Sequence, residues 1–235
     1  MSTGTGELVA DELELLRRLV PLAGARVADI GCGDAALSRR LLAPGMAASV
    51  AAIEVDRAQH AKNLAAPPVA GLAFHLAPAD ALPFADASFE AALMLKSLHH
   101  VPVARMDAAL AEVARVLAPG GLLYVSEPVF AGPLNEVMRV FHDEEAVRAA
   151  ALEALHRAAA RGVLEAVEER HFDTPIAFRD FDDFAARMMR VTHTDLAPDA
   201  ATVAEARRRF EAHLGPGGPR FARPIRGNLM RRPAR

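Results

Sequence analysis

The ten residues Val27-Ala28-Asp29-Ile30-Gly31-Cys32-Gly33-Asp34-Ala35-Ala36 decide the fold of this chain. A short apolar run that contains one acid breaks here into a Gly-x-Gly pair, and Leu37-Ser38-Arg39-Arg40-Leu41-Leu42 follows at helical spacing. This order is typical of a first strand, a tight turn and a first helix in a nucleotide-binding α/β domain. The stretch therefore predicts a ligand site at the turn between strand and helix.

The chemistry of the turn narrows the choice of ligand. Gly31 and Gly33 can adopt positive φ and let a ligand approach the backbone, and the new helix points free N–H groups toward the same place. The charge of Asp29 repels a pyrophosphate but attracts an ammonium or a sulfonium group. The spacing Gly31-x-Gly33-x-x-Ala36 also fits a loose dinucleotide fingerprint. These residues alone leave a nicotinamide cofactor open.

A second acid follows the second predicted strand, residues 48–53. Glu54 lies 23 residues after Gly31, with Val55 beside it. A carboxylate at the tip of strand two can accept hydrogen bonds from both ribose hydroxyls of an adenosine cofactor. Asp56 is expected instead to cap the helix over 56–64. Glu54 is therefore the predicted ribose ligand.

The remaining pattern up to residue 127 alternates short apolar runs with helical segments. Strands are predicted at 72–76, 91–95 and 122–125, and a helix over 103–117 ends at Pro119-Gly120-Gly121. The strand at 91–95 is uniformly apolar, as expected for a strand that is buried on both faces. The parallel βαβ series predicts a doubly wound sheet.

Several of these pieces together resemble the class I methyltransferases that use S-adenosylmethionine. The matching motifs are Asp29-Ile-Gly-Cys-Gly-Asp-Ala35, Ala79-Asp-Ala-Leu-Pro-Phe84, Ser88-Phe-Glu90, Ser97-Leu-His-His-Val101 and Glu112-x-x-Arg115-Val-Leu-x-Pro-Gly-Gly121. Their order and spacing resemble those of the subgroup with the type 11 methyltransferase domain, which includes the quinone C-methyltransferases. The likeness covers roughly residues 26–127 and disfavours a nicotinamide cofactor. It implies a Rossmann-like, seven-stranded sheet with a C-terminal helical elaboration.

The resemblance also implies a cofactor site for S-adenosyl-L-methionine, with S-adenosyl-L-homocysteine as its product. Asp80 is expected to accept a hydrogen bond from the adenine amine, and the backbone N–H of Ala81 to donate to the ring. Lys96, at the tip of strand four, either neutralises a carboxylate of the cofactor or of an acidic substrate, or is a surface side chain. The full predicted set is Asp29, Gly31, Cys32, Gly33, Glu54, Val55, Asp80, Ala81 and Lys96.

Methyl transfer from a sulfonium is an in-line displacement in which the enzyme supplies mainly proximity and alignment. A base is needed only if the acceptor must lose a proton, and no metal is required in principle. The candidate bases are His99, His100, His142 and His193, of which His100 lies just past strand four and is equally well explained as a structural residue. The predicted function is methylation of oxygen or carbon in a small-molecule acceptor.

Two other functions stay open on the sequence. Residues 205–235 hold nine arginines against Glu205 and Glu211, so this tail could hold RNA or an acidic protein for methylation, although such charge runs are usually solvated faces and we do not expect nucleic acid. The other is a non-catalytic S-adenosylmethionine-binding protein. The sequence leaves the oligomeric state open, a homodimer included.

Composition describes an ordinary globular chain. The 235 residues are 52% hydrophobic and 24% charged, with a formal net charge of -3. Cys32 is the only cysteine, so no disulfide framework is expected. The N-terminal region is acidic before any arginine, and no apolar run reaches membrane-spanning length, so we expect a cytoplasmic protein.

The chain is predicted to contain an N-terminal helix (1–24), a cofactor-binding core (25–130) and a C-terminal part (131–235) that completes the sheet and covers the substrate site. The N-terminal helix is expected over 6–20. In the C-terminal part we predict helices over 147–161, 180–188 and 200–214, strands over 164–172 and 221–230, the last antiparallel, and a loop that holds His193 and Asp195.

Overall fold

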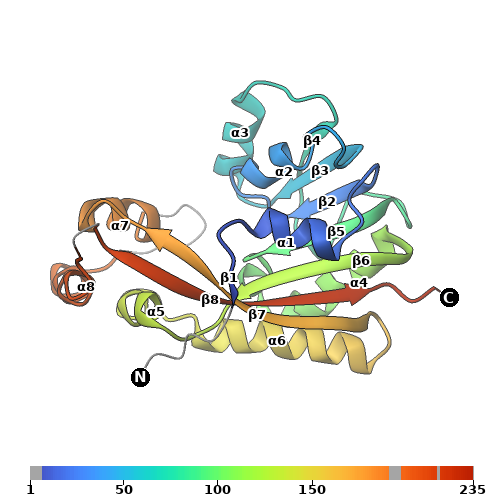
Figure 1. Ribbon diagram of the computed structural model, residues 1–235. Coiled ribbons are helices and arrows are strands. Elements are labelled where there is room, and N and C mark those ends of the chain that lie inside the picture. Colours follow the sequence, from blue (N-terminus) through green and yellow to red (C-terminus); the bar gives the residue numbers. More distant parts are fainter. Residues whose placement is uncertain (1–6, 191–196, 216–217, 235) are drawn as a thin grey trace.

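The computed structural model describes residues 7–190, 197–215 and 218–234. Their strands form one sheet with the order β1-β7-β8-β6-β5-β2-β3-β4, in which β8 runs antiparallel to both of its neighbours (Figure 1). The other pairs are parallel. The strands are β1 (Glu7–Leu8), β2 (Arg26–Ile30), β3 (Ser49–Glu54), β4 (Leu72–Leu76), β5 (Phe89–Leu95), β6 (Leu117–Pro128), β7 (Glu165–Ala177) and β8 (Arg220–Arg231).

Helices connect these strands and cover both faces of the sheet. They are α1 (Glu12–Leu19), α2 (Ala36–Arg40), α3 (Arg57–Ala65), α4 (Met106–Val116), α5 (Pro133–Met138), α6 (Glu145–Ala160), α7 (Phe181–Met188) and α8 (Ala200–Glu211). Two short 3-10 turns, η1 (Leu98–His100) and η2 (Val103–Arg105), link β5 to α4. Asp56 caps α3 by accepting a hydrogen bond from the Ala58 amide at 2.8 Å, as predicted.

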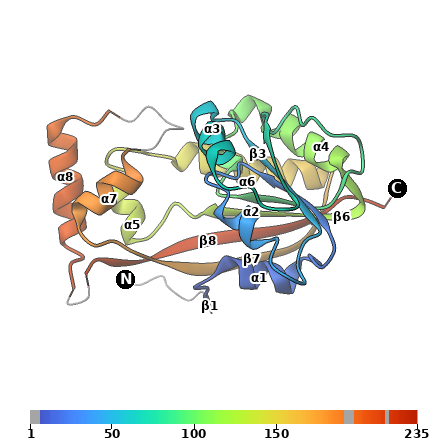
Figure 2. The same cartoon turned by 90° about the horizontal axis from the view of Figure 1, so that it is seen from above.

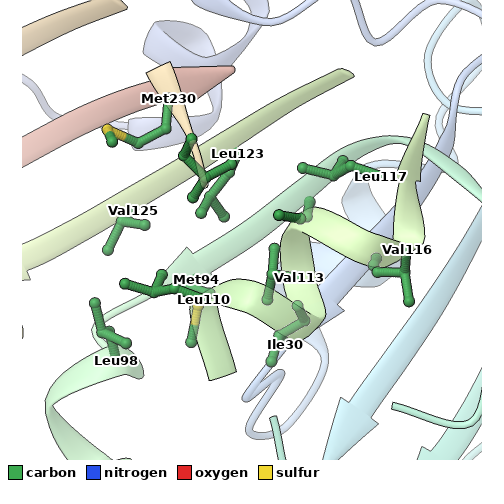
Figure 3. Packing of buried hydrophobic residues seen from close by; sticks show 14 of the residues in the cluster. Ile30, Met94, Leu98, Leu110, Val113, Val116, Leu117, Leu123, Val125 and Met230 are labelled. Atoms are coloured by element: carbon green, nitrogen blue, oxygen red, sulfur yellow. The ribbon is translucent and has the colours of Figure 1, made fainter. Parts of the chain in front are cut away.

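Neighbouring residues of the central strands enter different cores because side chains alternate across a sheet. On one face, Met94 of β5 packs with Leu110 and Val113 of α4, and α6 covers the same cluster (Figure 3). On the opposite face, Leu93 packs with Leu16 of α1. The uniformly apolar run of β5 is thus explained by burial on both sides, as the sequence predicted.

The C-terminal half of the chain builds a second apolar core beyond the main sheet. Strands β7 and β8 pair from Glu165 to Ala177, and their far ends extend past the other strands toward α5, α7 and α8 (Figures 1 and 2). Phenylalanines dominate the core among these helices, with Phe184 and Phe210 fully buried. We call this unit, formed by α5, α7, α8 and the adjoining ends of β7 and β8, the helical cover.

The main differences from the sequence prediction lie at the N-terminus. The predicted helix over 6–20 begins only at Glu12, where Asp11 caps it, and Glu7–Leu8 instead pairs in parallel with Phe172–Asp173 of β7. This added strand brings the described sheet to eight strands where seven were predicted. The doubly wound α/β class and the antiparallel closing strand are confirmed.

Candidate functional site

A cavity of about 420 Å³ opens at the carboxyl ends of the parallel strands. Its walls come from the loop after β2, the tip of β3, the segment after β4 and the segment from the end of β5 through η1. In parallel α/β sheets this is the edge at which ligands bind. Of the predicted site residues, the structure brings Gly31, Cys32, Gly33, Glu54, Val55, Asp80, Lys96 and His100 together in this wall.

The glycine loop is tightly packed against the segment after β5. Gly31 has a φ of +75°, and a Cβ at this position would lie 2.5 Å from the Ser97 Cβ. The Ser97 hydroxyl donates a 2.7 Å hydrogen bond to the Ile30 carbonyl, which fixes this close approach. Gly31 therefore meets both a conformational and a steric requirement, and both favour glycine.

Glu54 organises the loop from the tip of β3. Its Oε2 accepts a 2.9 Å hydrogen bond from the Gly33 amide, and its Oε1 accepts from the amides of Val55 and Asp56 at 2.8 and 2.9 Å. Asn63 of α3 closes the loop from the other side by donating to the Gly33 carbonyl at 2.7 Å. The carboxylate is buried yet borders the cavity, which is the position required of a ribose ligand.

Asp29 lies beneath the loop and outside the lining of the cavity. Its side chain is 3% exposed and accepts a 2.5 Å hydrogen bond from the Ser38 hydroxyl. Burial raises the pKa of the Asp29 carboxyl to about 6, against the opposing effect of the Ser38 bond, and the Glu54 charge raises it further. Because Asp29 does not touch the cavity, it can act on a ligand only through the electrostatic field of its charge. Burial and these two carboxylates also raise the pKa of the Cys32 thiol, which remains neutral at pH 7.

The two residues predicted to read adenine occupy different environments. Asp80 borders the cavity and forms an ion pair with Arg105 of η2, a partner that the sequence analysis did not identify. Ala81 is exposed and does not line the cavity, and its amide donates to the Pro78 carbonyl at 3.2 Å. The predicted donor role of Ala81 would need this N–H to change partner.

Lys96 lies in the cavity wall and is tied to the N-terminal helix. Its ammonium pairs with the Glu12 carboxylate, which also accepts a 3.1 Å hydrogen bond from the Tyr124 hydroxyl. Burial lowers the pKa of the Lys96 ammonium, and the charge of Glu12 opposes this shift. The alternative of a free surface side chain is wrong, since Lys96 is largely buried and paired.

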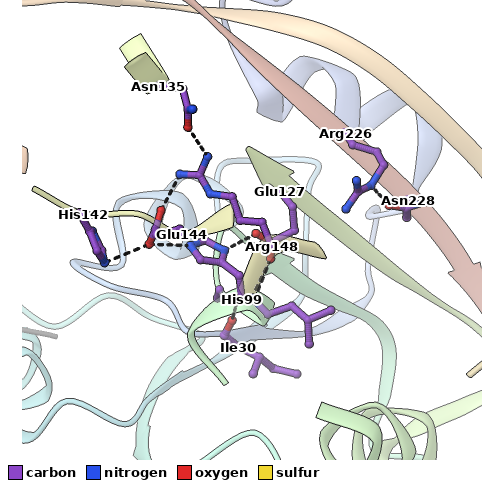
Figure 4. Close-up of polar contacts among 11 residues, drawn as sticks. Ile30, His99, Glu127, Asn135, His142, Glu144, Arg148, Arg226 and Asn228 are labelled. Carbon is purple, nitrogen blue, oxygen red and sulfur yellow. Dashed lines mark hydrogen bonds and ion pairs between the residues drawn. The ribbon is translucent and has the colours of Figure 1, made fainter. Parts of the chain in front are cut away.

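A buried polar network joins η1, β6 and the start of α6 (Figure 4). His99 contacts Glu127 through Nδ1 and lies 3.6 Å from Glu144 through Nε2. Arg148 donates to Glu144 at 2.5 Å and to Asn135 at 3.1 Å. Burial opposes protonation of His99, but its hydrogen bond to Glu127 and the nearby Glu144 carboxylate prevail and raise the pKa to about 9. His99 is therefore protonated at neutral pH and is no base.

Of the other candidate bases, His100 and His142 both lie near Glu144. His100 borders the cavity directly, whereas His142 lies 3.5 Å from Glu144 through its Nε2 and is not part of the cavity wall. His193 and Asp195 lie outside the described residues. The sequence analysis missed Glu127, Glu144 and Arg148 because nothing in their local sequence distinguishes them.

The described arginines of the C-terminal tail contact this chain's own residues. Arg208 and Arg209 pair with Glu205 at 2.7 Å, and Arg207 pairs with Asp182 at 3.1 Å. Such pairs compete with phosphate for the same cations. None of the described helices is both long and apolar enough to cross a lipid bilayer.

The geometry fits an adenosylated ligand with a cationic centre. The cavity is of the size that holds a nucleoside cofactor, and it offers carboxylates at the tip of β3 and after β4 and a glycine loop for close backbone approach. Its other walls are largely apolar, as Met94, Leu95, Val101 and Pro102 show. Glu54 fits a ribose, and Asp80 an exocyclic amine.

Comparisons with known proteins agree with this geometry. The family model described as "Methyltransferase domain" matches residues 28–125. The O-methyltransferase cnsE of Penicillium expansum is 35% identical over 133 residues, which cover 53% of this chain and 46% of that protein. The chain thus spans about half the length of this curated relative.

Solved structures match nearly the whole chain at low sequence identity. A Bacillus halodurans protein is 19% identical, with a TM-score of 0.67 over 94% of this chain and 99% of the other. An S-adenosylmethionine-dependent methyltransferase from Mesorhizobium loti is also 19% identical, with a TM-score of 0.55 over 94% and 97%. These likenesses concern the fold, and the family model adds the sequence motifs. Residues 28–125 thus match the methyltransferase domain family, and nearly the whole chain shares its fold with the solved methyltransferase structure.

Proposed function

We propose that this chain transfers the methyl group of S-adenosylmethionine to an oxygen atom of a small-molecule acceptor. The observation that carries the proposal is Glu54, a buried carboxylate at the tip of β3 that orders the glycine loop and borders the cavity. The name of the Penicillium relative favours oxygen over carbon as the acceptor atom.

Each part of the cavity has a role in holding the cofactor. Glu54 would accept hydrogen bonds from the ribose hydroxyls, and Asp80 from the adenine amine. Lys96 and Glu12 present a cation and an anion at the end of β5, where they can pair with the carboxylate and the ammonium of the methionine part. Bound S-adenosylmethionine supplies an electrophilic methyl on a cationic sulfur.

The chain's own contribution to the reaction is placement and proton removal. The acceptor must lie in line with the methyl group, beside His100 and under the helical cover. His100 and His142 are the described candidates for taking the hydroxyl proton, since His99 is held protonated by Glu127 and Glu144. Exclusion of water by the apolar wall strengthens the attraction between an anionic acceptor oxygen and the sulfonium.

Titration calorimetry tests the cofactor part of the proposal. We expect micromolar dissociation constants for S-adenosylmethionine and S-adenosylhomocysteine, and no heat with NAD. Acceptors are then screened among hydroxylated small molecules, with formation of S-adenosylhomocysteine as the readout. Tight binding of the cofactor without turnover of any hydroxylated acceptor would favour a binding protein, and binding of NAD alone would exclude the assignment.

The described arginines do not favour a nucleic-acid substrate, because those of α8 carry carboxylate partners. A methyltransferase that acts on RNA would bind it with a steep dependence on salt. We expect weak RNA binding at physiological salt, which a filter-binding titration at two salt concentrations measures.

A further inference from the structure

Three imidazoles gather around one carboxylate beside the cavity. Glu144 Oε1 lies 3.6 Å from His99 Nε2 and 3.5 Å from His142 Nε2 (Figure 4). His100, which borders the cavity, offers a ring nitrogen within 4.8 Å of the ligand atoms of His99 and Glu144. Among the described residues this is the group of histidine, cysteine and acidic side chains whose atoms converge closely enough to share one ion.

The separations suit a shared cation better than direct hydrogen bonds. A ring nitrogen and a carboxylate oxygen 3.6 Å apart are too distant for a good hydrogen bond. Two ligand atoms that each lie about 2.1 Å from one tetrahedral metal ion are about 3.4 Å apart. The His99 and Glu144 atoms therefore stand at nearly the spacing of two ligands in one coordination sphere.

The partners of these side chains resemble those of established metal ligands. Metal-binding histidines usually donate their second ring N–H to a carboxylate, which fixes the tautomer. His99 does this toward Glu127 through Nδ1, so its Nε2 is the atom that faces Glu144. Glu144 is held through its other oxygen by Arg148, and Arg148 by Asn135. His99 and Glu144 are thus each held in place by a hydrogen bond at the atom that faces away from the other.

The local charge is compatible with a bound cation. Glu127 and Glu144 are buried carboxylates beside these imidazoles, and Arg148 is a buried cation that pairs with Glu144. A metal ion held between His99 and Glu144 would neutralise part of this negative charge.

We propose that His99, His100 and Glu144 bind one divalent transition-metal ion of the Zn²⁺ type. Two imidazoles and a carboxylate are ligands that zinc accepts at catalytic sites, where a further position stays open. Because His100 borders the cavity, an ion held by these residues would lie at the edge of that cavity. An acceptor hydroxyl that reached such an ion would lose its proton more readily, and the proton would pass to solvent or to His142, since His100 would be held by the ion. Metal binding goes beyond the proposed methyl transfer and does not depend on it, whereas the role on an acceptor hydroxyl rests on that proposed function.

Metal binding is measured on the full chain without cofactor, so its failure leaves the methyltransferase proposal untouched. The purified chain is stripped with a chelator and titrated with Zn²⁺ by calorimetry and with Co²⁺ by visible absorption. We expect one ion per chain and a Co²⁺ spectrum of four or five ligands. Mg²⁺, which prefers oxygen ligands, is the control and should not compete. A chain that binds neither Zn²⁺ nor Co²⁺ overturns the proposal.

Variants locate the ion. Glu144→Gln keeps the shape of a buried side chain but loses the charge, and His100→Asn changes an exposed residue whose replacement leaves the core intact. Each should weaken Zn²⁺ at least about 10-fold. The matched controls are His171→Asn, an exposed histidine 3.0 Å from Glu169, and Cys32→Ser, and both should bind Zn²⁺ as the parent does. Equal affinity in all four variants would show adventitious binding and overturn the site.

Discussion

The Gly33 amide donates a 2.9 Å hydrogen bond to Oε2 of Glu54, which joins the loop after β2 to the tip of β3. One buried carboxylate thereby shapes the loop and borders the space assigned to the ribose. We expect cofactor binding and the order of the loop to be coupled through this contact, so that changes at either residue alter both.

Replacing Glu54 tests this coupling. Glu54→Ala removes three hydrogen bonds from backbone amides and the proposed ribose ligand, so affinity for S-adenosylhomocysteine should fall at least about 10-fold. Calorimetry measures the affinity. Glu90→Ala is the control, since its carboxylate binds Arg26 at the opposite end of the sheet. Unchanged affinity in Glu54→Ala would make the ribose assignment wrong.

Gly31→Ala tests the close approach to Ser97. The new Cβ would lie 2.5 Å from the Ser97 Cβ at a φ of +75°. The comparison variant is Gly24→Ala, which has a similar φ of +73° and open space around its Cβ position. Both should lose about 1–2 kcal/mol from backbone strain, and Gly31→Ala a further 1–3 kcal/mol from overpacking. Urea unfolding measures the difference, and equal losses would mean that the loop shifts freely.

Ionisation of Asp29 makes the free energy of unfolding depend on pH. Its folded pKa of about 6 lies above the value of 3.8 for an unperturbed carboxyl, so its contribution to stability is present below pH 4 and lost as the pH rises through 6. Asp29→Asn removes the ionisation and can keep the bond from Ser38. Relative to this variant, the parent should lose up to about 3 kcal/mol between pH 4 and pH 7. Urea unfolding curves at several pH values measure the difference in stability between the parent and Asp29→Asn. A difference that stayed constant with pH would contradict the prediction.

The helical cover is predicted to be separable from cofactor binding. Phe184 is fully buried among Phe141, Phe178, Phe181 and Phe210, so Phe184→Ala should destabilise the cover by about 3–5 kcal/mol. None of these residues borders the cavity, so the affinity for S-adenosylhomocysteine should stay within about twofold. Hydrogen exchange locates the loosened segment. A parallel loss of cofactor affinity would show that cover and cavity fold as one unit.

Local patterns predicted the first half of the chain well. The ends of β3, β4 and β5 can be predicted because Gly and Pro residues lie next to these short apolar stretches. Strand β4, for example, matches its predicted range of 72–76. The resemblance to the methyltransferases then supplied an expected cofactor contact for the residues at each strand end. The predicted likeness to the type 11 methyltransferase domain is confirmed for residues 28–125 by the matching family model.

Contacts between distant residues were beyond local reasoning. Glu7–Leu8 has the pattern of a helix start, but pairing with Phe172–Asp173, far along the chain, makes it a strand. Glu127 and Glu144 meet His99 only after β6 and α6 are in place. The pairing of Lys96 with Glu12 likewise joins two segments that share no sequence signal. The assignments to individual cofactor atoms and the choice of base remain predictions.

The placement of strands β7 and β8 affects which parts of this protein can change independently during evolution. They belong to the main sheet at one end and to the helical cover at the other (Figure 2). The described residues that line the cavity fall between 30 and 102, whereas the cover is built from residues after 131. Selection can therefore reshape the cover through substitutions that leave the cavity intact. Under the proposed function, a lineage can change its acceptor and keep the same methyl donor.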